Sequence, residues 1–170
     1  IGPFCILKDA ARIKKGSKLI SNIIIEGDTE IGENCVVYPF ASIGLPPQDM
    51  KYKGEKTGVK IGSNNTIREY STIHRASVGG EGVTSIGNGN FFMAYVHVAH
   101  DCKIGNSVIM ANVATLAGHV LIEDHAVIGG LSAIHQFTRI GAYAMVGGFS
   151  GIGQDIPPYM IASGARAKLF

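Results

Sequence analysis

Large apolar residues recur every six positions along most of this 170-residue chain. From Ile86 to Ile152 the period is unbroken, with an aliphatic residue, a methionine or a phenylalanine at each step. The next residue is often glycine, and the residue two positions earlier is usually small or β-branched. Residues two apart on a strand share a face, so both repeated side chains point inward while the glycine-led tetrad turns the chain. The period therefore predicts an all-β parallel β-helix, a three-sided prism of nearly eight coils with about eighteen residues per coil.

Two segments interrupt the period. Between Ile43 and Ile61 the pattern is lost over a lysine-rich stretch. We expect a loop there, at about residues 45–60, that either binds an anionic ligand or is a solvated excursion. A second, glycine-rich loop is expected at residues 76–85, between two repeats that are thirteen residues apart. That spacing fits one repeat with seven inserted residues or two repeats with one, and the sequence leaves both open.

The repeat is expected to end before Pro157 and Pro158, because proline cannot continue a strand ladder. We therefore predict a β-helix domain at residues 1–156 and a closing segment at residues 157–170. A hydrophobic content of 46% suits a single domain with a sizeable core.

Composition and charge argue against several classes of protein. The formal net charge of +2 is too small to indicate nucleic-acid binding by itself. The apolar runs fall short of the roughly 18 residues that span a membrane. The three cysteines are odd in number and occupy the inward small position of the repeat, so we expect buried thiols rather than a disulfide framework. The expected setting is the reducing cytoplasm.

The register of the repeat gathers histidines at one corner of the prism. Three of them follow equivalent strands on successive coils, and a fourth points outward from the strand that leads to this corner. In chain order the four are His97, His100, His119 and His135. His125 falls at a different corner. Imidazoles on an outward corner have no core to fill, so the column indicates a functional site.

One hypothesis is a metal site, as in hexapeptide-repeat carbonic anhydrases. His100 and His119 lie about one coil apart, but a metal needs at least three converging ligands. We expect no acidic or cysteine side chain to complete the set, because Cys102 points inward. The sequence therefore favours a site without metal.

The other hypothesis is acyl transfer. A histidine that takes the proton of an attacking hydroxyl typically speeds a reaction by about 10²–10⁴. Asp101 directly follows His100 and is placed to orient its imidazole, and the N–H of Gly118, one coil away, is placed to face a developing oxyanion. No serine or cysteine lies beside His100 as a covalent nucleophile, which favours direct transfer.

Seven stretches of the chain resemble one enzyme family: "ASIGLPPQDMKYKGE", "TIHR", "HVAHDC", "ATLAGHV", "IGGLSAIHQF", "MVGGFSG" and "QDIPPY". They are similar to the UDP-N-acetylglucosamine O-acyltransferases, hexapeptide-repeat proteins that form left-handed parallel β-helices and usually assemble as homotrimers. The resemblance implies transfer of an R-3-hydroxyacyl group from acyl carrier protein to the 3-hydroxyl of UDP-N-acetylglucosamine, the first step of lipid A biosynthesis. It implies no cofactor and no metal.

The resemblance also implies a role for particular residues. The implied catalytic residues are His100 as general base, Asp101 as its partner and Gly118 as oxyanion donor. The implied substrate-binding residues are Asp49, Lys51, His74, His97, His119, His135 and Gln136. The implied residues of the acyl channel are Met145 and Gly148. A small residue at position 148 leaves room for a longer acyl chain, although a turn glycine of the repeat is an equally good explanation.

Family members usually carry a further coil before this stretch and a C-terminal helical domain after it, so we expect both to be missing here. Two rivals stay open: the related UDP-3-O-acylglucosamine N-acyltransferase, and a binding scaffold without activity. The "DMKY" of the first loop favours the O-acyltransferase. Acyl-chain length and the choice between a 3-hydroxyl and a 3-amino acceptor remain open.

Overall fold

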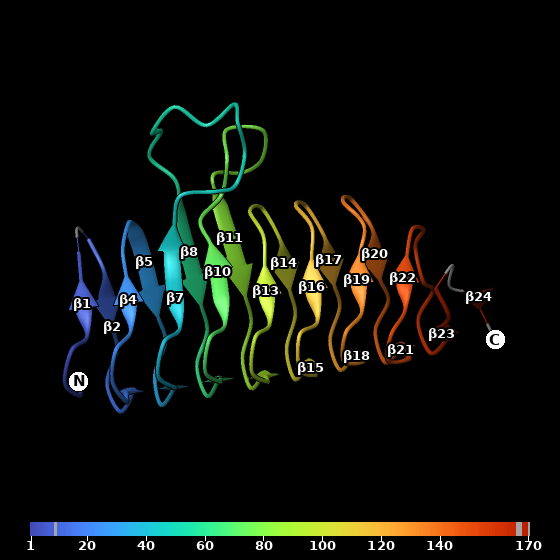
Figure 1. The fold of residues 1–170 in the computed structure, drawn as a ribbon, viewed down its shortest axis with the longest axis horizontal. Helices are drawn as coiled ribbons and strands as arrows, with labels where there is room; N and C mark the ends of the chain where they lie inside the picture. The colour runs from blue at the N-terminus through green and yellow to red at the C-terminus, as the bar shows by residue number, and fades with distance from the viewer. Residues whose placement is uncertain (9, 166–167, 170) are drawn as a thin grey trace.

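The computed structural model describes residues 1–8, 10–165 and 168–169. Within these residues the chain forms 24 strands and no helix, and three sheets make the sides of a prism (Figure 1). Successive strands pass from sheet I to sheet II to sheet III and return to sheet I one coil further on. The molecule is a left-handed parallel β-helix, as predicted, whereas most parallel crossovers in proteins have the opposite hand.

Each sheet takes every third strand of the repeat. Within the described residues, sheet I contains β1 (Ile6–Leu7), β4 (Ile24–Ile25), β7 (Ser42–Leu45), β10 (Thr72–His74), β13 (His97–Val98), β16 (Thr115–Leu116), β19 (Ala133–Ile134) and β22 (Gly151–Ile152). Sheet II contains β2 (Arg12–Ile13), β5 (Asp28–Ile31), β8 (Gly58–Ile61), β11 (Val83–Ile86), β14 (Lys103–Ile104), β17 (Leu121–Ile122) and β20 (Arg139–Ile140). Sheet III contains β3 (Lys18–Leu19), β6 (Val36–Val37), β9 (Thr66–Ile67), β12 (Phe91–Phe92), β15 (Ile109–Met110), β18 (Val127–Ile128), β21 (Met145–Val146), β23 (Ile161–Ser163) and β24 (Lys168–Leu169).

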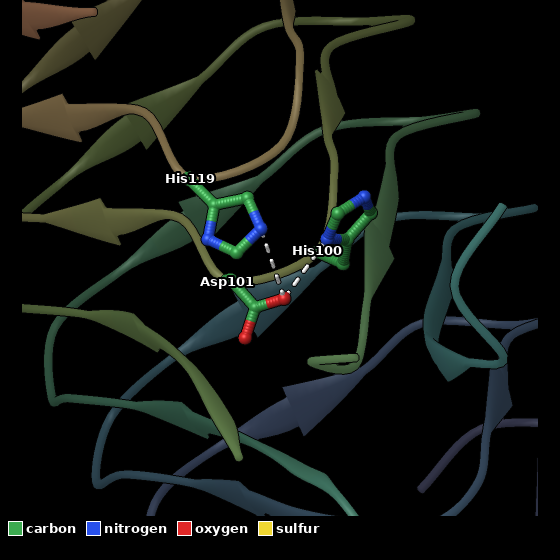
Figure 2. Close-up of side chains that lie close together, drawn as sticks. All are labelled: His100, Asp101 and His119. Atoms are coloured by element: carbon green, nitrogen blue, oxygen red, sulfur yellow. Dashed lines mark hydrogen bonds and ion pairs between the residues drawn. The ribbon is translucent and has the colours of Figure 1, made fainter. Parts of the chain in front are cut away.

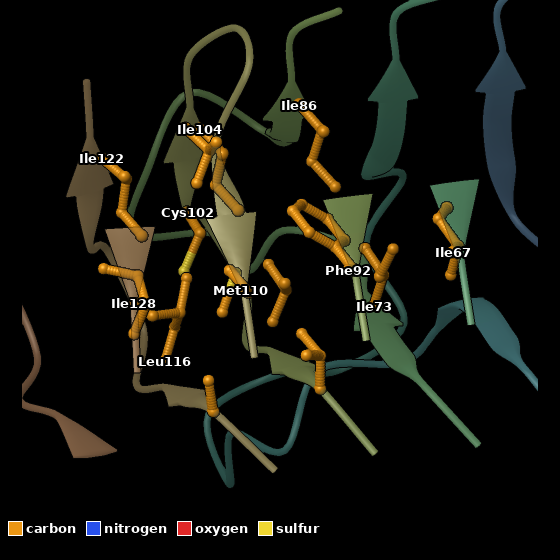
Figure 3. Packing of buried hydrophobic residues seen from close by; sticks show 14 of the residues in the cluster. Ile67, Ile73, Ile86, Phe92, Cys102, Ile104, Met110, Leu116, Ile122 and Ile128 are labelled. Atoms are coloured by element: carbon orange, nitrogen blue, oxygen red, sulfur yellow. The ribbon is translucent and has the colours of Figure 1, made fainter. Parts of the chain in front are cut away.

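The repeated apolar residue lies in every strand from β1 to β22 and points into the prism, as the side chains in Figure 3 do. In sheet I, for example, Val98 pairs with Ile73 on one side and with Leu116 on the other. From Leu19 to Ile152 all of these residues are buried. Because full burial of such a side chain stabilises the fold by about 1.5–3 kcal/mol, the stack is the main source of stability.

Both interruptions of the repeat lie at the corner between sheets I and II, called corner I–II (Figure 1). Residues 46–57 form the first loop, the flap, and residues 75–82 form the second loop. Each loop joins a strand of sheet I to the next strand of sheet II, so the second loop is one repeat with inserted residues, the first of the two open readings. The predicted loops extended too far, because residues 58–60 and 83–85 pair as strand between β5 and β14.

Most of the glycines that follow the repeated apolar residue do not have the turn conformation predicted for them, and Gly44, with φ 80°, is an exception. Gly87 and Gly105 do not have a positive φ, and a Cβ on Gly87 would lie 2.6 Å from the carbonyl oxygen of Gly105 in the next coil. Glycine is needed there because the coils approach closely. The left-handed conformation falls on the third residue of the corner tetrad, usually a larger residue such as Ser107, with φ 55°.

Parallel pairing continues past Pro157 and Pro158. Ile156 bridges Ile140, and β23 then pairs in parallel with β21. The two prolines lie at the corner between these pairings, where their missing N–H groups break no ladder. The division at residue 156 stays a prediction, and residues 166, 167 and 170 of the closing segment lie outside the described residues.

The cysteine prediction is confirmed for two of the three residues. Cys35 and Cys102 are buried with free thiols, and Cys5 is partly exposed. Burial raises the pKa of the Cys102 thiol to about 12, so this sulfur stays protonated and unreactive. In the part of the chain that the structure describes, no helix has the length and apolar character needed to cross a membrane.

Candidate active site

His100 and Asp101 form a hydrogen-bonded pair at corner I–II, in the tetrad that follows β13 (Figure 2). The distance from His100 Nδ1 to Asp101 Oδ2 is 2.9 Å, and the Asp101 side chain is only 3% exposed. His119 approaches from the next coil, with its Nε2 3.8 Å from the same carboxylate oxygen. The two imidazoles meet edge to face, with ring centroids 5.2 Å apart. The structure thus brings the three residues together: the register predicts that His100 and His119 share this corner, and the approach of Asp101 to His119 is a finding of the structure.

Asp101 is held by residues that the sequence did not single out. Its Oδ2 accepts hydrogen bonds from Ser77 N–H at 2.9 Å and from the Ser77 hydroxyl at 2.8 Å. Its own N–H donates to Thr84 Oγ1 at 2.9 Å. Ser77 lies in the second loop, whose path no repeat register predicts, so the sequence carries no clear signal for this contact.

Gly118 lies against the His100 ring. A Cβ at this position would sit 2.5 Å from His100 Cε1 and 2.7 Å from Nε2, so a side chain would displace the imidazole. Among the described residues, the Gly118 N–H has no hydrogen-bond acceptor. A bare, unpaired N–H beside the imidazole is suited to binding an oxyanion.

His74 and His97 form a second imidazole pair beside the first, with ring centroids 5.1 Å apart. His97 Nδ1 lies 2.7 Å from the hydroxyl oxygen of Thr72. Burial, together with the nearby His97 and His100, lowers the pKa of His74 to about 4, and burial with His100 also lowers the pKa of His97. Both imidazoles are therefore neutral near pH 7 and can each donate one hydrogen bond and accept another.

The chain is similar to known proteins in sequence and in fold. The family described as "Bacterial transferase hexapeptide (six repeats)" matches residues 84–118. An acyl-[acyl-carrier-protein]–UDP-N-acetylglucosamine O-acyltransferase from Thermodesulfovibrio yellowstonii is 72% identical over the whole chain, which covers 66% of that protein. A crystal structure of a UDP-N-acetylglucosamine acyltransferase has TM-score 0.97 and 48% identity, over 99% of this chain and 65% of that one. The UDP-N-acetylglucosamine O-acyltransferase from Moraxella catarrhalis has TM-score 0.87 and 40% identity, over 98% of this chain and 72% of that one. The chain belongs to the UDP-N-acetylglucosamine acyltransferase family.

The chain spans slightly less than two thirds of the first two of these relatives, at 66% and 65% of their lengths. The similarity to the acyltransferases covers the β-helix, both loops and all the histidines described above.

The flap of this acyltransferase family member carries Asp49 and Lys51. Asp49 Oδ1 accepts a hydrogen bond from the Lys51 N–H at 2.9 Å, which shapes the tip of the loop. Among the described residues, no hydrogen bond or ion pair joins the two side chains to the histidines. Arg75, for which the sequence predicts no role, connects the flap to the second loop because its Nε donates to the Tyr52 hydroxyl at 3.1 Å.

His135 and Gln136 lie on corner I–II beyond His119, as the register predicts. Among the described residues, His135 is not part of the group of His100, Asp101 and His119. Its Nδ1–H donates to the carbonyl oxygen of Gln136 at 3.1 Å. The edge of the cluster is instead Phe137, whose ring stacks on His119 with centroids 4.7 Å apart.

Met145 and Gly148 lie away from the histidines of their own chain. Met145 is in sheet III, and Gly148 follows it at the corner between sheets III and I. Gly148 does not have a positive φ, and a Cβ there would come no closer than 3.4 Å to the carbonyl oxygen of Gly130. The fold of a single chain therefore has no need of glycine at position 148.

The expectation that no acidic residue completes a metal-ligand set is wrong. One ligand atom from each of His100, Asp101 and His119 lies within 4.8 Å of the others. The acidic ligand is Asp101 Oδ2, which lies 2.9 Å from His100 Nδ1 and 3.8 Å from His119 Nε2. The same carboxylate oxygen already accepts hydrogen bonds from Ser77 and His100, which suits it equally to orienting an imidazole.

Proposed function

We propose that this protein transfers an R-3-hydroxyacyl group from acyl carrier protein to the 3-hydroxyl of UDP-N-acetylglucosamine, the first step of lipid A biosynthesis. The observation that carries the proposal is the His100–Asp101 pair next to the bare backbone of Gly118. The relative from Thermodesulfovibrio yellowstonii is named for this type of reaction, and the chain matches it along the whole length of the chain.

His100 acts as the general base. A carboxylate can only accept a hydrogen bond, so Asp101 Oδ2 fixes the proton of His100 on Nδ1 and leaves the Nε2 lone pair free. Nε2 accepts the proton of the sugar hydroxyl as the hydroxyl oxygen attacks the acyl carbonyl carbon. The negative carboxylate then stabilises the imidazolium that forms.

Gly118 stabilises the charge that develops on the acyl oxygen. Its N–H donates to the oxyanion of the tetrahedral intermediate, at a distance from His100 that only glycine permits. The intermediate collapses as the bond from the acyl carbon to the carrier sulfur breaks. The carrier sulfur leaves as a thiol with the proton that His100 returns. His100 is then again the neutral base.

The sugar nucleotide binds between the flap and the neutral histidines. Lys51 supplies positive charge for phosphate, and Asp49 shapes the loop that carries it. His74 and His97, as neutral imidazoles, bind hydroxyl or carbonyl groups without adding charge. His119, His135 and Gln136 extend the same corner toward the sugar.

The acyl chain extends toward Met145 and Gly148 of a neighbouring subunit in a homotrimer. Support comes from a line of exposed apolar residues along the corner between sheets III and I, on successive coils. These residues are Phe40, Tyr70, Tyr95, Val113, Leu131 and Phe149. An exposed apolar line of this length favours burial against another subunit. Since the fold does not need glycine at position 148, its role is to leave room for the acyl chain.

The test is a transfer assay with the full-length protein, R-3-hydroxyacyl carrier proteins of several chain lengths, and one of three acceptors: UDP-N-acetylglucosamine, its 3-amino analogue or UDP-3-O-acylglucosamine. We expect a product acylated at the 3-oxygen, the same rate with a chelator present, and a shorter preferred chain for Gly148→Met. Acylation of an amine on an already O-acylated sugar would favour the related N-acyltransferase. A folded trimer that binds the nucleotide without turnover would contradict the proposal.

A further inference from the structure

Asp101 differs in burial from the residues that occupy its position on other coils of this corner. It is the third residue of its corner tetrad and has a left-handed φ of 60°, as this position does on most coils. The third residues of the next two coils are His119, whose side chain is 19% exposed, and Phe137, which is 68% exposed. The Asp101 side chain is 3% exposed, although it ends in a polar carboxyl group. Burial of a carboxylate at an outward corner is costly and requires a specific reason.

The second loop accounts for this burial. It takes the place of the corner tetrad on the preceding coil and lies against the carboxylate of Asp101. A Cβ on Gly80 would lie 2.2 Å from Asp101 Oδ1, so this glycine is required by close approach. Ser77 is 1% exposed and donates both its N–H and its hydroxyl to Asp101 Oδ2.

These contacts converge on one oxygen atom. Asp101 Oδ2 accepts from Ser77 N, from Ser77 Oγ and from His100 Nδ1, all between 2.8 and 2.9 Å. The two donors from Ser77 fix the plane of the carboxylate, and the fixed plane leaves Oδ2 directed at the His100 ring. The oxygen that orients the base is therefore itself oriented by the inserted loop.

We propose that Ser77 is a positioning residue, which holds Asp101 Oδ2 toward His100 Nδ1 and so keeps the lone pair of His100 on Nε2, where a hydroxyl substrate meets it. The inference rests on the proposed function for its effect on turnover. The loop of residues 75–82 then contributes to catalysis through Ser77. Ser77 contacts Asp101 and does not contact the base itself.

The test compares Ser77→Ala, which removes the hydroxyl and keeps the N–H, with Ser77→Thr, which restores a hydroxyl. Ser77→Cys is a second variant that keeps the size of the side chain with a weak donor. The matched control is Val78→Ala, which changes the next residue of the loop, a residue that is 52% exposed. The readouts are kcat and KM for transfer, and the tautomer of His100 from nitrogen-15 NMR of the labelled imidazole.

We expect Ser77→Ala and Ser77→Cys to lower kcat by about 10-fold to 100-fold, the effect of losing one hydrogen bond to a charged group. KM for both substrates stays within about twofold, because Ser77 contacts Asp101 rather than substrate, and Ser77→Thr recovers most of the loss. The fraction of His100 that carries its proton on Nδ1 falls in the Ala and Cys variants only.

Wild-type kcat in Ser77→Ala, or an equal loss in Val78→Ala, would overturn the inference. An unchanged His100 tautomer in Ser77→Ala would also overturn it, whether or not the wild-type protein transfers acyl groups. Absence of transfer in the wild type, with the tautomer still dependent on Ser77, would remove the proposed function and leave the positioning of His100 by the loop in place.

Discussion

Asp101 and His125 occupy the same place in the repeat at two different corners of the prism. Both are third residues of a tetrad, with φ 60° and 62°. His125, at the corner between sheets II and III, stacks its ring on Tyr143 with centroids 4.6 Å apart, the kind of contact that aromatic residues make at regular corners. Asp101 is buried under an inserted loop and bonded to a histidine. The two residues have the same backbone position. The loop inserted on the coil next to Asp101 makes the difference between a residue that packs at a corner and a residue that binds the candidate base.

Histidine substitutions at the two corners test this comparison most strongly. His100→Ala removes the base, and we expect kcat for transfer to fall by about 10²–10⁴. His125→Ala removes one stacked ring and should leave kcat unchanged. Both proteins should keep the far-UV circular dichroism and mass of the wild type. An equal loss of activity in the two variants would contradict a site confined to corner I–II.

Gly118→Ala sharpens the comparison at the site itself. The new Cβ would lie 2.5 Å from the His100 ring, and we expect the displaced imidazole to lower kcat by about 10-fold to 100-fold. Gly118 does not have a positive φ, so alanine introduces no backbone strain. Gly153→Ala is the matched control, because a Cβ at Gly153 meets nothing within 4 Å. Full activity in Gly118→Ala would show that the ring has another place to lie.

The buried His74 makes stability depend on pH. Its pKa is about 4 in the fold, against 6.5 without burial, so between these values the unfolded chain binds more protons. The free energy of unfolding therefore falls as the pH is lowered from above 6.5 toward 4, and at pH 5 this histidine contributes a loss of about 2 kcal/mol. Denaturant titration gives the free energy of unfolding at pH 7.5 and at pH 5. The difference between these two values should be smaller in His74→Gln than in the wild type, by about 2 kcal/mol. The same pH dependence in variant and wild type would assign it to other groups.

The smallest effect of substitution is expected at the corner between sheets II and III, which carries no inserted loop. Tyr143 is half exposed and stacks between His125 and Tyr159, with centroid distances of 4.6 and 5.2 Å. Tyr143→Ala should lower the free energy of unfolding by about 1 kcal/mol and leave kcat unchanged, since ring pairs of this kind contribute about 0.5–1.5 kcal/mol. Denaturant titration and the transfer assay check the two parts separately. A loss of activity without a loss of stability would connect this corner to the site.

The sequence predicts the parts of the molecule that depend on register. The spacing of eighteen residues places Val98 and Leu116 in one stack, and it puts His100 and His119 on one corner because every step between them is regular. Ser77 could not be predicted, because an insertion has no register and its path depends on contacts that form only in the folded state. The approach of Asp101 to His119 was missed for a related reason, since side-chain direction at a left-handed residue is not carried by the repeat.

The most direct test of corner I–II as the active site is a crystal structure of the protein with the acylated sugar nucleotide bound. This active-site assignment predicts the 3-oxygen of the sugar within hydrogen-bond reach of His100 Nε2, about 2.6–3.2 Å. It also predicts the acyl carbonyl oxygen facing the Gly118 N–H, with the Ser77–Asp101–His100 contacts unchanged. A product bound at another corner, or a 3-oxygen closer to a different base, would contradict the assignment of corner I–II as the active site.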